Sequence, residues 1–71
     1  MKKFLMVVEE NGRGFSAYSP DLDGCVATGT SREEVEKAMI EAVRIHIEGM
    51  KKEGYNIPEP KSYSKIIEVM V

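Results

Sequence analysis

The sequence predicts a small α+β fold, a β-β-β-α-β two-layer sandwich in which one long helix covers one face of a small sheet. Three observations indicate this order. Short apolar or alternating segments, separated by turn-forming residues, fill the first 30 residues. A helix-start signal at Ser31 then opens a helical pattern that ends near Gly54. The last eight residues, from Ser64 to Val71, are again mostly apolar and β-branched.

The first half of the chain is typical of three antiparallel strands. Residues 4–8 form a continuous apolar run bounded by charges, which predicts the middle strand of the sheet. Asn11-Gly12 suits a tight reversal, and the alternation of apolar and polar residues over 15–19 predicts the second arm of a hairpin. Turn formers gather at residues 20–24, after which residues 25–30 predict the third strand.

The helix is the best-defined element of the sequence. Ser31 and Glu34 have the spacing of a capping box, in which each side chain accepts a hydrogen bond from the other's backbone amide. The helix should end near Glu53, where Gly54 fits a left-handed cap. One apolar stripe at helical spacing is expected to cover the sheet; it contains Val35, Ala38, Met39, Ala42, His46 and Met50.

A second apolar row on the helix is rotated away from this stripe. It consists of Ile40, Val43 and Ile47, and one sheet face cannot easily hide both rows. We therefore expect the chain to associate with itself through this row or through a sheet edge, with a dimer as the first expectation.

The residues after the helix predict a connector and a last strand. Ile57-Pro58-Glu59-Pro60 is expected to be extended, because a proline disfavours helix at the residue before it. Ser64–Val71 should form the final strand, and the helix crossover places it parallel to the first or third strand.

Composition narrows the class of protein. The 71 residues suffice for a single domain with one core, and 42% of them are apolar, as in folded proteins. The formal net charge of −2 makes nucleic acid a poor direct partner and suits a basic protein partner. With one cysteine and no apolar run long enough for a signal peptide or a membrane span, we expect a cytoplasmic protein.

The aspartate, histidine and cysteine residues of this sequence do not have the spacing of a catalytic, metal or cofactor site, so none is predicted. Asp21 and Asp23 lack the spacing of a calcium loop, and an Asx-type turn with Gly24 accounts for them. His46 lies in the apolar stripe, which favours a partly buried histidine over a zinc ligand or a general base. Cys25 has acidic neighbours and is expected to be a small buried residue.

Three motifs together resemble the N-terminal domain of HicB antitoxins over nearly the whole chain. They are Pro20-Asp21-Leu22-Asp23-Gly24-Cys25, the helix start Ser31-Arg32-Glu33-Glu34, and the exit Ile57-Pro58-Glu59-Pro60. The resemblance implies a truncated ribonuclease H-like fold without that fold's catalytic carboxylates. It also implies a partner, since this family binds and silences HicA, a small RNA-cleaving toxin.

The resemblance further implies a protein-binding module that is not an enzyme. Residues 1–71 would be a single HicB-like domain with no C-terminal DNA-binding domain, and Asp23 stands where the family commonly has proline. Two alternatives stay open: a self-assembling domain of unknown partner, and a vestigial metal-dependent nuclease using Asp21, Asp23 and His46. The expected toxin-facing residues are Pro20, Asp21, Leu22, Asp23, Gly24, Glu41 and Glu48.

Overall fold

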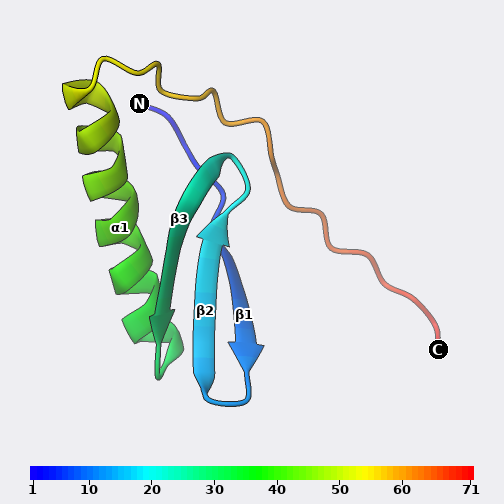
Figure 1. Cartoon of the computed structure of the whole chain (residues 1–71). Coiled ribbons are helices and arrows are strands. Elements are labelled where there is room, and N and C mark those ends of the chain that lie inside the picture. Colours follow the sequence, from blue (N-terminus) through cyan, green and yellow to red (C-terminus); the bar gives the residue numbers. More distant parts are fainter.

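A computed structural model describes all 71 residues and contains three strands and one helix. In chain order these are β1 (Val7–Asn11), β2 (Gly14–Ser19), β3 (Leu22–Gly29) and α1 (Arg32–Lys52). The helix lies against one face of the antiparallel sheet, and the chain then leaves the domain as an extended tail (Figure 1). The predicted α+β arrangement of sheet and helix is confirmed.

The sheet has the order β1-β2-β3, with β2 in the centre. The prediction that the first strand lies in the middle is wrong, because β1 pairs only with β2. The apolar run of residues 4–8 also extends beyond the strand, which begins at Val7. The predicted hairpin is confirmed, and its reversal falls at Gly12-Arg13, where the Asn11 side chain accepts a hydrogen bond from the Arg13 amide.

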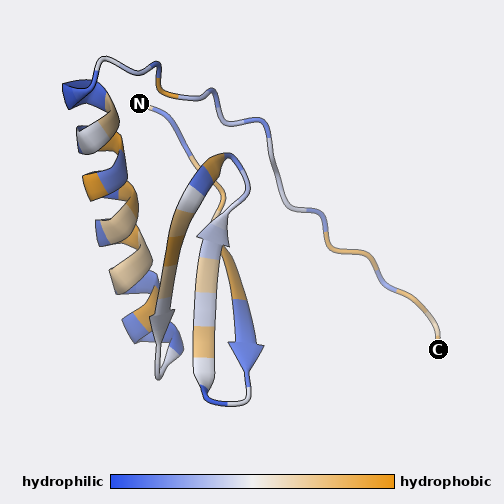
Figure 2. Cartoon of the chain, in the orientation of Figure 1, coloured by the Kyte–Doolittle hydropathy of each residue, from blue (hydrophilic) through white to orange (hydrophobic).

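The predicted last strand is not formed within the chain. Ser64–Val71 has no strand pairing, and all eight residues are exposed. Figure 2 shows that apolar residues continue along this free tail. The β-forming character of the segment is local, but a strand also needs a neighbour that supplies hydrogen bonds, and the tail contacts none.

The ends of α1 agree with the capping signals. The Ser31 side chain accepts a hydrogen bond from the Glu34 amide, and the Glu34 carboxylate returns to Thr30, accepting from its amide and its hydroxyl. The sequence predicts that the Glu34 carboxylate accepts from the Ser31 amide, but its partner is Thr30, one residue earlier. At the other end Gly54 has φ 74°, and the Tyr55 amide donates to the Met50 carbonyl, as in a left-handed helix cap.

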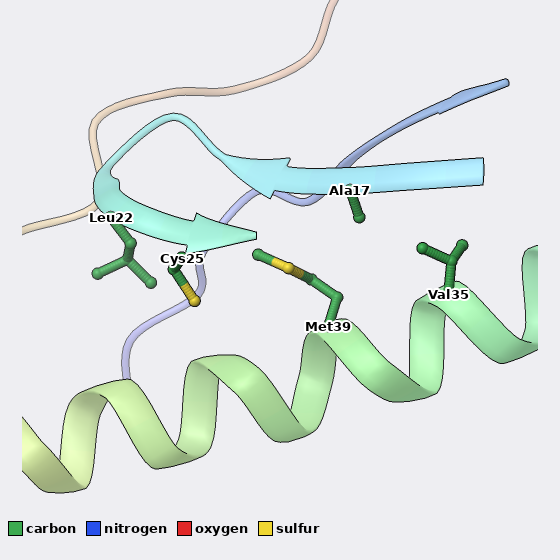
Figure 3. Packing of buried hydrophobic residues seen from close by; sticks show 5 residues of the cluster. All are labelled: Ala17, Leu22, Cys25, Val35 and Met39. Carbon is green, nitrogen blue, oxygen red and sulfur yellow. The ribbon is translucent and has the colours of Figure 1, made fainter. Parts of the chain in front are cut away.

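The core lies between α1 and the helix-facing side of the sheet (Figure 3). Val35 and Met39 are fully buried, and the rest of the predicted helix stripe is half-buried. Phe4, Met6 and Val8 pack only partly against this core from the first strand and the segment before it. The buried apolar residues are Ala17, Leu22, Cys25, Val35 and Met39.

Candidate partner-binding surface

The turn between β2 and β3 is tighter than the sequence predicts. Ser19 pairs with Leu22, so only Pro20 and Asp21 form the reversal. Leu22 is 2% exposed and belongs to the core. The expectation that Leu22 contacts a partner is therefore corrected, because its side chain points into the domain under the sheet (Figure 3).

A bulge follows this turn on β3. The register shifts between Tyr18 and Ser19, because Tyr18 pairs with Val26 and leaves the intervening residues of β3 out of step. Gly24 sits in this bulge with φ 75°, a conformation that other residues adopt at a cost. Of the predicted turn surface, Pro20, Asp23 and Gly24 are the exposed residues.

The Asp21 carboxylate is hydrogen-bonded to a distant part of the same chain. Its carboxylate accepts hydrogen bonds from the backbone amides of Lys61 and Ser62, at 3.1 and 3.0 Å, and from the Ser62 hydroxyl at 3.3 Å. These bonds, led by the Ser62 amide, hold the pKa of Asp21 below its usual value. Asp21 thus fastens the base of the tail to the β2–β3 turn.

This contact predicts a pH-dependent fastening of the tail. Because the pKa of Asp21 is lowered in the folded state, the contact is fully present above the unfolded-state pKa of about 3.9 and is lost as pH falls through the lowered folded value. We expect the Lys61 and Ser62 amide resonances to shift together over that acidic window, as followed by NMR. In Asp21→Asn the shift should vanish. Asp23→Asn is the matched control, since Asp23 makes no side-chain hydrogen bond, and it should leave the transition unchanged.

The two acidic helix residues of the predicted surface flank an arginine. Arg44 Nε donates to Glu41 at 3.1 Å, and Arg44 Nη1 donates to Glu48 at 2.7 Å. Arg44 lowers the pKa of Glu41, and both carboxylates raise the pKa of Arg44. All three side chains remain more than half exposed. The triad therefore presents two carboxylates and one guanidinium, with a net charge of −1.

The predicted self-association row is only partly at the surface. Ile40 is 62% exposed, whereas Val43 and Ile47 are half-buried and pack against the core. Ile40 and Val43 of this row, together with Met39, form one wall of a groove of about 200 Å³, whose other wall is Phe4, Leu5 and Met6. The sequence predicts that this row exceeds what the sheet covers, and in the structure only Ile40 of the three residues is exposed.

His46 and Cys25 lie where the sequence places them. His46 is half-buried on α1, and Cys25 is 4% exposed. Burial raises the pKa of the Cys25 thiol. No three histidine, cysteine, aspartate or glutamate residues gather closely enough to hold a metal ion, so Asp21, Asp23 and His46 form no such group.

Sequence reasoning did not find the fastening of the tail by Asp21 or the groove beside Phe4. The Asp21 contact joins residues 40 and 41 positions apart, and no local signal announces it. A hint of the groove is present in the sequence, because the apolar run of residues 4–8 is longer than an edge strand needs.

The helix is not apolar enough along its length to cross a membrane.

Comparison with known proteins agrees with this fold. A family model described as a HicB-like antitoxin of bacterial toxin-antitoxin systems matches residues 4–70. A chain of a solved HicA3 and HicB3 toxin-antitoxin complex is similar to this chain, with 32% identity and a TM-score of 0.67. That match covers 82% of this chain and 72% of the other. A search of curated proteins found no match.

A crystal structure of the antitoxin HicB3 is also similar, with 33% identity and a TM-score of 0.67. The match covers 80% of this chain and 42% of that chain, so this chain spans less than half of that antitoxin's length. The family model covers nearly the whole chain, and both solved structures share the fold at more than 30% identity. The chain therefore belongs to the family of HicB-like antitoxins of bacterial toxin-antitoxin systems.

Proposed function

We propose that this chain is an antitoxin that binds a HicA-type, RNA-cleaving toxin and silences it by covering the toxin's RNA site. The observation that carries the proposal is the similarity to a chain of the solved HicA3 and HicB3 complex, at a TM-score of 0.67 and 32% identity. The family match over residues 4–70 supports the same role.

Electrostatics supports this choice of partner. A protein that binds RNA needs a positive surface to neutralise phosphates. This chain carries a net charge of −2, and its exposed helix face includes Glu41 and Glu48. Opposite potentials accelerate encounter and favour the correct partner over others. An acidic module placed over the RNA site would also repel RNA.

The surface that we assign to the toxin has two parts. One is the exposed portion of the β2–β3 turn, Pro20, Asp23 and Gly24, and the other is the pair Glu41 and Glu48 on α1. The β2–β3 turn lies at the same end of the domain as the C-terminal half of α1 (Figure 1), which carries Glu48, and Glu41 lies near the middle of the helix. Leu22 supports this surface from beneath as a core residue.

Inhibition by covering a site needs no catalysis, and the chain offers no assembled nuclease site in its place. A metal-dependent nuclease would need free carboxylates that converge on one ion. Asp21 is instead bound to the Lys61 and Ser62 amides, and it forms no ligand group with Asp23 and His46.

Co-expression with the product of a neighbouring short gene tests the proposal. We expect this chain to restore growth that the gene product inhibits, and the two proteins to purify as one complex. Added divalent metal should have no effect on the rescue. If the neighbouring gene product is not toxic, or forms no complex with this chain, the result would instead favour the alternative of a self-assembling domain whose partner is unknown.

A charge-matched pair of variants tests the surface. Glu41→Gln with Glu48→Gln removes two carboxylates from the proposed interface and should weaken toxin binding about tenfold, or by about 1.4 kcal/mol, mainly through slower association. Glu9→Gln with Glu10→Gln removes the same charge from exposed positions on β1 and should leave affinity nearly unchanged. Equal losses in both variants, measured by calorimetry, would refute this surface while leaving the antitoxin role intact.

A further inference from the structure

Residues 64–71, the last part of the tail, have the pattern of a strand but pair with no strand and are exposed. Ile66 is 91% exposed and Met70 is 99% exposed, although both are apolar side chains. In an extended conformation Ile67, Val69 and Val71 share one face, while Glu68 interrupts the opposite face. Exposed apolar area costs about 25 cal/mol per Å² relative to burial. The tail therefore has one face that is suited to packing.

The domain has an unpaired sheet edge and an apolar groove beside it. β1 is an edge strand, so every second residue directs a backbone amide and carbonyl outward with no partner. On the helix-facing side, Phe4, Met6 and Val8 are only half-buried. The groove beside them is lined by Met39, Ile40 and Val43 of α1. It also includes Ser19, whose buried hydroxyl has no hydrogen-bond partner.

The single chain is also less compact than its length allows. A folded chain of 71 residues should have a radius of gyration of roughly 11 Å, whereas this chain has 13.9 Å and extends over 48 Å in its longest dimension. Only 6 of 71 residues are buried. On the β1 side the apolar residues Phe4, Met6 and Val8 are only partly covered, and the apolar side chains of the tail do not cover them.

The tail is directed away from its own sheet. Asp21 fixes its base at Lys61 and Ser62, and the residues that follow run outward until the C-terminus lies well apart from β1 (Figure 1). An arm held in this way reaches a second molecule without unfolding the domain. A second copy has the same vacant edge, so one two-fold arrangement would occupy both edges with both tails.

We propose that two copies of this chain exchange their tails, each giving residues 64–71 as a fourth strand beside β1 of the other. Ile67, Val69 and Val71 face the groove between the N-terminal segment and α1, and Glu68 faces solvent. Strand addition of this kind supplies backbone hydrogen bonds along the edge, and alternate side chains fill the groove. This inference concerns the assembly of the chain and does not depend on toxin binding.

The molar mass in solution gives the first test, by light scattering on a sizing column. The full chain should have twice its monomer mass of 8.0 kDa. A chain that ends at Tyr63 keeps the Asp21 contact and should have the mass of its own monomer, not twice that mass. Ile67→Lys with Val69→Lys should also be monomeric. Ile66→Lys with Met70→Lys adds the same charge to the opposite face and should remain dimeric.

Isotope-filtered NMR on the unmodified protein distinguishes exchange from a tail that folds onto its own domain. Labelled and unlabelled copies are mixed after unfolding and refolding. Contacts between the methyl groups of Val8 and those of Val69 should then appear between copies. A monomeric full chain, a truncated chain that stays dimeric, or contacts confined to one copy would overturn the proposal.

Discussion

Met39→Ala is expected to destabilise the domain by about 2–5 kcal/mol. Met39 is fully buried, and its side chain reaches from α1 toward the sheet on the side of Cys25 (Figure 3). Truncation removes apolar contact and leaves a cavity that the two layers cannot close without moving. A domain of this length has a free energy of unfolding of only roughly 4–11 kcal/mol. The change therefore removes a large fraction of the total stability, and urea unfolding followed by circular dichroism measures it.

Met39→Leu is the matched control for this prediction. It keeps the volume and the apolar character of the side chain, and such exchanges usually cost less than about 1.5 kcal/mol. Equal losses in both variants would mean that the site requires the methionine thioether and not its volume. An unchanged midpoint in Met39→Ala would contradict the assignment of Met39 to the core.

Gly29→Ala is expected to destabilise the domain by about 1–3 kcal/mol or more, because it forces the helix and the sheet apart. Gly29 ends β3 where the chain turns toward α1. A Cβ at this position would lie 2.7 Å from the Val35 amide nitrogen and 3.0 Å from the Val35 Cα. These are backbone atoms, so no rotation of a side chain relieves the overlap. A melting temperature lower by about 4–8 °C per kcal/mol should result.

Gly49→Ala provides the opposite expectation with the same chemical change. Gly49 lies within α1, and a Cβ there meets nothing within 4 Å. Alanine should stabilise the helix by about 0.5–1 kcal/mol, because glycine loses more backbone entropy on folding. The two variants should therefore move the melting temperature in opposite directions. An unchanged or raised melting temperature in Gly29→Ala would show that the approach of Gly29 to α1 is not a constraint on stability.

The helix and the hairpin were predictable from sequence because their signals are local. Ser31 and Glu34 stand within one turn of each other, and Gly54 directly follows the end of the helix. The place of Ser64–Val71 was not predictable in the same way. Its apolar pattern gives strand propensity, but pairing depends on a neighbour distant in the sequence, and no such neighbour is present in the single chain.

The candidate surface was only partly predictable for a related reason. Turn formers over residues 20–24 indicate a reversal, but they do not reveal which of them point inward. The register shift after Tyr18 decides that Leu22 is buried and that Asp23 is exposed. Likewise, the count of acidic residues predicts a negative surface, but only the structure shows that Arg44 bonds to both Glu41 and Glu48.

Because Cys25 is buried, its reactivity reports how often the sheet and α1 separate in the folded protein. The lone thiol lies between the sheet and α1 and is 4% exposed, and its thiolate is the nucleophile that reacts with thiol reagents. Labelling therefore requires the two layers to separate, and its rate under native conditions follows the fraction of molecules that are transiently open. Partner binding that holds the layers together would slow this labelling, so the rate at which a thiol reagent modifies Cys25 reports occupancy without a fused tag.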